Sequence, residues 1–179
     1  MTDAIHELKI RAEILHKRIT ARDSRALKRL RVLAAFRRSS DEHLVEIAAT
    51  IRRRDCLTAI AAELGFANWP QAKSALTGQG QTTDFGTLLC PLTLAGGHIN
   101  RWYTRYEEAA EARATCQGYL LAYRRQYLVV DRYYIEDLGL DPQDEDWEAI
   151  GFDWVRPRSV AARARLYAKL VAGLPREAA

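Results

Sequence analysis

Residues 56–78 constrain the fold more than any other stretch, because they predict two short helices joined by a tight turn. Gly65 stands where a helix ends in a left-handed residue, a conformation that glycine adopts without strain. Asn68 is a favourable N-cap for the second helix, with Gln71 three residues on and Pro70 in the first turn. An arginine-rich helical segment leads into this pair. The combination favours a nucleic-acid-binding helix-turn-helix, in which the helices supply shape and the arginines supply phosphate affinity.

Two overlapping motifs in this pair carry a resemblance to known proteins. Residues 60–66 (Ile-Ala-Ala-Glu-Leu-Gly-Phe) resemble the first helix and turn of helix-turn-helix regulators of the AraC type. Residues 64–73 are more closely similar to a Gly-Phe-x-x-Trp helical element of uncharacterised bacterial proteins, because Trp69 stands where a DNA-reading helix places an exposed polar residue. The resemblance covers about 20 residues and implies no catalytic residue. It leaves a structural alternative, in which the helices pack through Phe66 and Trp69 and enter no groove.

Positive charge is concentrated in the N-terminal part of the chain. Residues 1–54 carry 14 Lys and Arg against 7 Asp and Glu, whereas residues 55–179 carry 13 against 16. A basic segment on a mildly acidic body is typical of contact with a polyanion, although amphipathic helices with solvated arginines give the same count. The candidate nucleic-acid-binding residues are Arg25, Lys28, Arg29, Arg31, Arg52, Arg53, Arg54, Gln71 and Lys73.

The first predicted helix begins at Thr2 or Asp3 and carries a narrow apolar seam. Its apolar residues step by three and four positions, which is the spacing of a heptad seam that packs against one partner helix. That partner is either a neighbouring helix of the chain or a second protein molecule. In the second case a homodimer or protein-partner contact is formed by Ile5, Leu8, Ala12, Leu15 and Ile19.

Two further helices are predicted before the helix pair. The second helix begins at Ser24 and keeps Ala34 on its apolar side. The third begins at Ser39 in a capping-box pattern and ends near residues 52–54, where cations suit a helix C-terminus. Asp55 then caps the first helix of the pair.

The polar, glycine-containing stretch after the pair is the best linker in the chain, and the pattern changes beyond it. Residues 85–93 are apolar and tolerate a strand, and residues 98–103 alternate. The other expected elements are a helix at 104–117, strands at 119–123 and 127–130, a short helix capped by Asp131 and a last helix from Ser159 to Gly173.

These elements predict an α+β fold, with an N-terminal basic helical bundle followed by a small antiparallel sheet that has helices on one side. The expected division is a basic helical domain at 1–77, a linker at 78–84, a small α+β domain at 85–174 and a tail at 175–179.

A second candidate surface interleaves cations with aromatic residues around the expected strands. Such a mixture suits single-stranded nucleic acid, because bases stack on rings while guanidinium groups hold phosphates. The same mixture also describes the aromatic core of any small sheet with charged edges. The residues of this possible second surface are Arg101, Arg105, Tyr123, Arg124 and Arg125.

Two features could support chemistry, and each has a simpler structural explanation. His98 follows two glycines, and a nucleophilic pair with Cys90 or Cys116 would need an orienting group and an oxyanion site that the spacing does not supply. The acidic run 141–148 offers oxygen ligands, but it lacks the spacing of a calcium loop and fits a solvated loop with an acidic helix start. We therefore expect no metal and no cofactor, and we lean against an enzyme.

The remaining features narrow the class of protein. No apolar run reaches the roughly 18 residues that a membrane helix needs, and the first residues have no apolar signal core. Three cysteines at wide spacing match no zinc motif and suit reduced thiols. We expect a cytoplasmic, non-enzymatic regulator or accessory protein that binds DNA or RNA through its basic helices. The alternative is a protein-interaction or assembly module, and an enzyme around His98 is a third, less favoured hypothesis.

Overall fold

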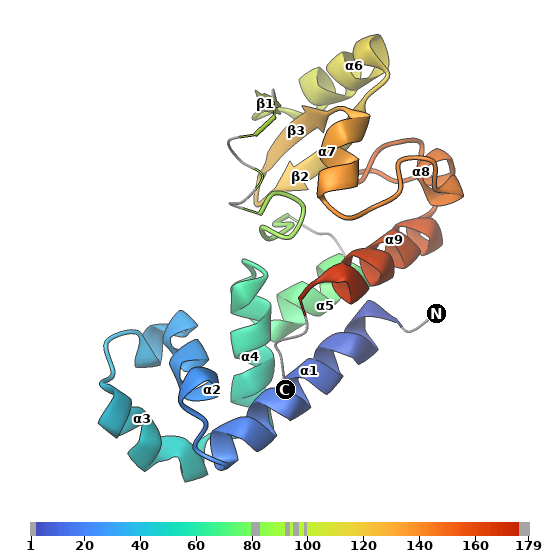
Figure 1. Ribbon diagram of the computed structural model, residues 1–179. Helices are drawn as coiled ribbons and strands as arrows, with labels where there is room; N and C mark the ends of the chain where they lie inside the picture. The colour runs from blue at the N-terminus through green and yellow to red at the C-terminus, as the bar shows by residue number, and fades with distance from the viewer. Residues whose placement is uncertain (1–2, 80–82, 92–93, 95–96, 99, 176–179) are drawn as a thin grey trace.

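The structure is a computed structural model that describes residues 3–79, 83–91, 94, 97–98 and 100–175 (Figure 1). Helices fill the N-terminal part, and a three-stranded antiparallel sheet of order β1-β3-β2 follows. The predicted α+β class is confirmed. The helices before the sheet are α1 (Ala4–Thr20), α2 (Ser24–Arg29), α3 (Asp41–Ile47), α4 (Arg53–Glu63) and α5 (Trp69–Thr77), with short 3-10 turns η1 (Leu30–Val32), η2 (Ala34–Phe36) and η3 (Ala48–Thr50).

The apolar seam of α1 finds its partners within the chain. Asp3 caps the helix by accepting the Ile5 N–H at 3.2 Å. All five seam residues are at most 5% exposed, and α1 packs against α4 and against the last helix, α9 (Val160–Gly173). The sequence left two possible partners for the seam, a neighbouring helix or a second protein molecule. In the structure the neighbouring helices cover the seam, so its residues are not exposed to a second protomer.

The segment between α1 and α4 differs from the expected pair of long helices. The helix that starts at Ser24 ends after six residues, and Ala34 is exposed in η2. Ser40 rather than Ser39 caps α3, because its hydroxyl accepts the His43 N–H while the Ser39 carbonyl accepts from a neighbouring arginine. The short turns η1, η2 and η3 occupy the rest of this segment, and η1 and η3 still bury Leu30 and Ala48.

The arginine run at residues 52–54 begins α4 and does not end α3. Asp55, predicted as the cap, is instead the third residue of α4, and its carboxylate accepts the Arg52 N–H at 2.8 Å. Arg53 and Arg54 thus lie at the positive end of a helix dipole, which is the opposite of the favourable placement expected from the sequence.

The α4–α5 pair has the predicted local structure. Gly65 has a φ of 82°, in the left-handed region. Asn68 Oδ1 accepts the Gln71 N–H at 2.9 Å, and Gln71 Oε1 accepts the Ala67 N–H at 2.8 Å, which together form a reciprocal cap. Trp69 is only half-buried, although it packs against the main core.

Residues 85–87 connect this pair to the sheet instead of forming a strand. The Thr87 N–H donates to the Leu64 carbonyl at 2.9 Å. On the other side, Phe85 and Gly86 exchange backbone hydrogen bonds with Arg124 at 2.9 and 2.7 Å. Gly86 has a φ of 67°, and a Cβ there would lie 2.5 Å from the Leu64 carbonyl oxygen. The turn of the helix pair and the β2–β3 turn are therefore held close together.

The sheet lies between the main core and α6 (Tyr106–Cys116). Its strands are β1 (Arg101–Tyr103), β2 (Tyr119–Tyr123) and β3 (Gln126–Val130). One face packs on the main core, and the other packs under α6 through a small cluster that includes Leu120 and Val129. The outer edge of β2 is covered, because Leu120 exchanges backbone hydrogen bonds of 2.9 Å with Phe152 and Trp154.

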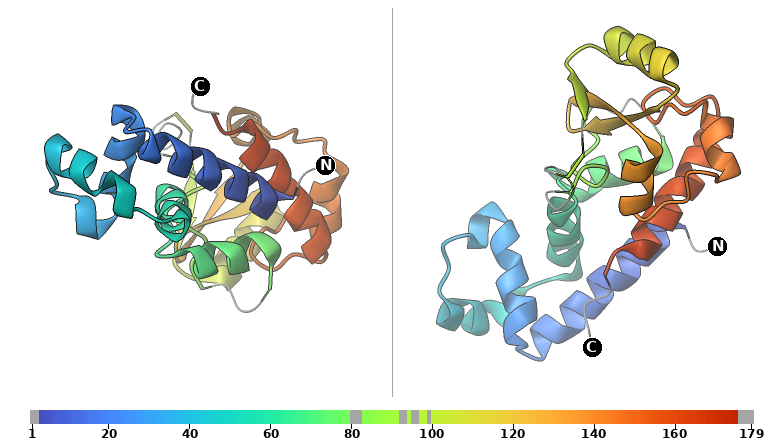
Figure 2. Two further views of the ribbon diagram at one scale, coloured as in Figure 1. Left: turned by 90° about the horizontal axis from the view of Figure 1, so that it is seen from below. Right: turned by 45° about the horizontal axis from the view of Figure 1, so that its top comes forward.

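The C-terminal helices return to the N-terminal part. They are α7 (Arg132–Asp137), α8 (Glu145–Ile150) and α9, capped as expected by Asp131 and Ser159 at the first and last. Helix α9 packs on α8, α1 and α5, and Figures 1 and 2 show it running beside α1. One continuous core thus crosses the predicted boundary at 78–84, of which residues 80–82 lie outside the described residues.

Candidate nucleic-acid interface

Two predicted phosphate-binding cations share one carboxylate within the protein. Lys28 Nζ lies 3.3 Å from Asp41, and Arg31 lies 2.5 Å from the same carboxylate. Arg31 also donates to the Ser39 carbonyl at 2.9 Å. The hydrogen bond from Lys28 and that from Arg31 hold the pKa of Asp41 below its usual value, against a smaller effect of burial. These contacts join α2 to the start of α3, so both cations have a structural role.

Three other predicted cations also have acidic partners, and the weakest of these contacts joins Arg54 Nε to Asp55 Oδ1 at 3.9 Å. Arg29 forms a two-pronged ion pair with Glu63, with distances of 2.8 and 2.6 Å, and this pair ties α2 to the end of α4. Arg53 lies 3.5 Å from Glu13 of α1. A bidentate guanidinium–carboxylate pair is among the stronger surface contacts, so a phosphate would have to compete with it.

Other arginines in the N-terminal part of the chain have no acidic partner among the residues that the structure describes. Arg25 and Arg52 are exposed and belong to the predicted set. Arg37 and Arg38 are exposed too, and the sequence reasoning missed them. The available signal was simply two adjacent arginines after an apolar stretch.

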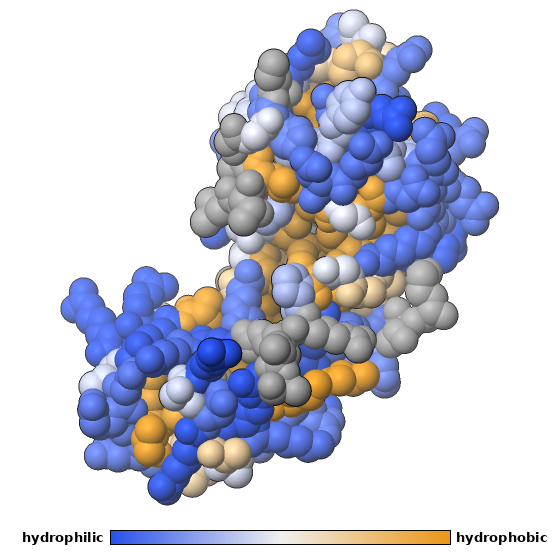
Figure 3. All heavy atoms as spheres, in the orientation of Figure 1, coloured by the Kyte–Doolittle hydropathy of each residue, from blue (hydrophilic) through white to orange (hydrophobic). Residues whose placement is uncertain are grey.

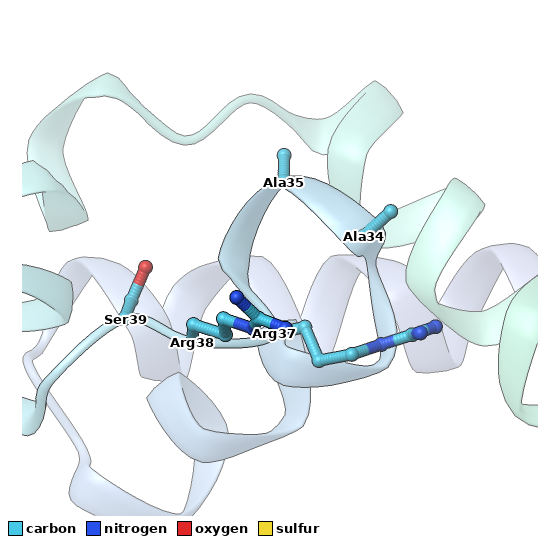
Figure 4. A pocket seen from close by; sticks show the side chains of 5 residues that line it. All are labelled: Ala34, Ala35, Arg37, Arg38 and Ser39. Carbon is cyan, nitrogen blue, oxygen red and sulfur yellow. The ribbon is translucent and has the colours of Figure 1, made fainter.

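Arg37 and Arg38 line a shallow pocket of about 540 Å³ together with Ala34, Ala35 and Ser39. Figure 4 shows both long side chains extending from the η2 turn, whereas the two alanines present only methyl groups. Figure 3 shows mostly hydrophilic side chains over this part of the molecule, which we call the arm (α2 to α3). The arm therefore offers two exposed arginines, neighbours in the sequence, beside a small hollow.

The second helix of the pair offers little to a DNA groove. Gln71 is engaged as part of the cap of α5. Lys73 is exposed, but α5 buries its other face against α4, α1 and α9. Of the two polar residues predicted on this helix, only Lys73 has a free side chain.

The residues of the possible second surface lie on β1, around the β2–β3 turn and directly before α6. Trp102 is 45% exposed, and its ring meets Tyr123 edge-on with centroids 5.7 Å apart. Arg124 and Arg125 form the exposed β2–β3 turn next to Tyr123. Arg105 is exposed and pairs with Glu108 at 3.4 Å, and Arg101 is exposed on β1.

His98 has a carboxylate partner, since its Nε2 lies 2.9 Å from Asp137 Oδ2. Its ring packs edge-on against Tyr134, whose hydroxyl donates to the Leu89 carbonyl at 2.9 Å. Burial and a hydrogen bond with Cys90 raise the pKa of Tyr134, so the buried thiol contacts this tyrosine. The Asp137 side chain is 61% exposed, and the arrangement is a hydrogen-bonded His–Asp pair at the edge of an aromatic contact.

Basic side chains of α9 pair with carboxylates of the acidic run. Asp144 caps α8 and lies 2.5 Å from Lys169 Nζ. Asp146 is 1% exposed and accepts from Arg165 and from Lys169, the latter at 2.8 Å. Burial would raise the pKa of Asp146, but these hydrogen bonds and charges outweigh it and lower the pKa. Within the described ranges, no group of three or more His, Cys, Asp or Glu side chains is placed to hold a metal ion.

Comparisons with protein-family models, with curated protein sequences and with solved structures gave no match to this chain. In the part of the chain that the structure describes, no helix has the length and apolar character needed to cross a membrane.

Proposed function

We propose that the protein is a non-enzymatic nucleic-acid-binding regulator or accessory factor that contacts phosphates through its basic N-terminal helices. The observation that carries the proposal is that the consecutive residues Arg37 and Arg38 are both exposed and have no acidic partner among the described residues. Guanidinium groups that are not committed to internal carboxylates can bind phosphate oxygens at little structural cost. Arg25 on α2 and Arg52 at the start of α4 would add further phosphate contacts.

The ion pairs give several of the predicted phosphate-binding cations a structural role instead. Lys28, Arg29 and Arg31 hold the arm together, so they support the interface indirectly. Phosphate contacts position a protein on a duplex but do not read bases, and base reading would need side chains that reach a groove. Because Gln71 is engaged in a cap, we propose binding with little sequence preference.

A double variant of the arm tests the proposal. Each phosphate contact contributes a slope of about −0.9 to log K against log salt on duplex DNA, so R37Q/R38Q should shrink the slope by about 2 units and weaken binding for all sequences alike. The measurement is fluorescence anisotropy with a duplex, a single strand and an RNA over a series of salt concentrations.

The matched control is R124Q/R125Q, which removes the same charge from the β2–β3 turn. A loss confined to the arm variant supports the proposal. A loss confined to the control would move the interface to the sheet, where Trp102 could stack bases. Equal losses in both, or absence of binding by the intact protein at low salt, would overturn the proposal.

The second candidate function, a protein-interaction module, rests on Ile10 and Ile14. These side chains are 39% and 52% exposed and lie one turn apart on α1. Because the heptad seam is buried, these two side chains form the exposed apolar surface of α1. If the intact protein binds no nucleic acid, a loss of protein association in I10S/I14S would favour this function.

A further inference from the structure

A second pocket, of about 490 Å³, lies where the end of α6 meets the ends of the strands and the start of α7. It belongs to the sheet part of the molecule and has no residue of the arm. Its walls carry two arginines, Arg101 from β1 and Arg132 from α7, and two amide side chains, Gln117 and Gln143. A volume of this size is within the range that small-molecule sites occupy.

The two arginines differ in how far their charge is already compensated. Arg101 is exposed and has no hydrogen-bond or ion-pair partner in the described ranges. Its place in the register is opposite Val129, which also lines the pocket. Arg132 donates to Glu136 at 3.1 Å, which holds the guanidinium in position and raises its pKa through that hydrogen bond and charge. Four further N–H groups of Arg132 remain for a ligand.

A carboxylate also lines the pocket, and it limits the ligands that fit. Asp131 uses one oxygen to accept the Tyr134 N–H at 3.0 Å, so its second oxygen can accept from a ligand hydroxyl or ammonium group. Gln117 is the left-handed C-cap of α6, with a φ of 52°, and it adds an amide to the same wall.

We propose that this pocket binds a small carboxylic acid that also bears hydroxyl or amino groups. Arg101 and Arg132 would bind the ligand carboxylate, and Asp131 with the two glutamines would bind its polar body. Arg132 is already paired with Glu136, and Asp131 balances the charge of Arg101, so these four groups have no net charge. The site therefore suits a ligand whose single carboxylate meets Arg101 while its hydroxyl or ammonium group meets Asp131, and it gives no advantage to a polyphosphate. The proposal does not depend on nucleic-acid binding by the arm.

A cysteine in the pocket provides the assay. Cys116 is exposed and lines the pocket, whereas Cys56 and Cys90 are buried. Alkylation of Cys116 in the folded protein therefore reports on occupancy. The probes are glycerate, glutamate and glycerol 3-phosphate, each compared with sodium chloride at equal ionic strength. If only free protein reacts, an acid present at five times its Kd slows alkylation about sixfold.

Matched variants make the test specific. R101Q should abolish the protection, whereas R105Q should retain it, because Arg105 is an exposed, ion-paired neighbour outside the pocket. Unlabelled Cys56 and Cys90 in both variants verify that the fold is intact. Protection by glycerate or glutamate that depends on Arg101 supports the proposal. The proposal would be overturned if chloride protected equally well or if only glycerol 3-phosphate protected. It would also be overturned if protection were undiminished in R101Q or if no protection were seen.

Discussion

Asp146→Asn should show how much the ion-pair network between α8 and α9 stabilises the fold. Asp146 is 1% exposed and interacts with both Arg165 and Lys169. Removing one partner of a fully buried ion pair costs about 3–5 kcal/mol. The two cations are 48% and 33% exposed and can recover part of their hydration, so we expect a loss of about 2–3 kcal/mol.

Urea unfolding followed by tryptophan fluorescence measures this loss, because Trp147 and Trp154 are buried next to the network. Glu148→Gln is the control, since Glu148 is an exposed residue of the same helix and a change there should stay within about 0.5 kcal/mol. An Asp146→Asn variant within that same margin would refute the reasoning that the network is coupled to folding.

The pH dependence adds an independent check. The pKa of Asp146 is lowered in the folded state, so its contribution is fully present above the unfolded value of about 3.9 and is lost as pH falls through the folded pKa. The free-energy difference between wild type and Asp146→Asn should therefore be constant from about pH 5 to 8 and close below about pH 4. A difference that persists in acid would point to packing rather than charge.

Two further predictions concern the helix pair and the linker. Trp69→Ala should cost about 2–3 kcal/mol in the same urea assay, below the 3–5 of a fully buried tryptophan, because Trp69 is half-buried; a near-neutral variant would make it a binding residue. Limited proteolysis should cut first within 78–84, and because α9 packs on α1 the fragments should co-elute at the size of the intact protein in gel filtration. Separate elution would contradict a shared core.

Features set by adjacent residues were predictable from the sequence. The left-handed Gly65 and the caps at Asn68, Asp131 and Ser159 depend on side-chain chemistry within three or four positions, and all four are present. The strand at Tyr119–Tyr123 has its predicted bounds, because an apolar run with a tyrosine at each end stops at a polar turn.

The predicted helix boundaries were wrong where two neighbouring residues could each begin or end a helix. Ser39 and Ser40 are both acceptable caps, and in the structure the Ser40 hydroxyl is the one that accepts the His43 N–H. The arginine run at 52–54 could end one helix or begin the next. Asp55 lies at the start of α4, but it is three positions after the N-cap, Arg52, and is not itself the predicted cap.

Contacts between distant parts of the chain explain why the candidate site could be predicted only in outline. Arg29 and Glu63 are 34 positions apart, so no local pattern shows that this arginine is already paired. The excess of basic over acidic residues in the N-terminal segment therefore overstates the charge that a polyanion would meet. Once Lys28, Arg29 and Arg31 are assigned to internal carboxylates, the uncommitted cations that we propose for phosphate contact are Arg37 and Arg38, directly after η2, with Arg25 and Arg52. An interface of that size would contact few phosphates, and its total salt slope should be near −2 to −4 rather than about −6.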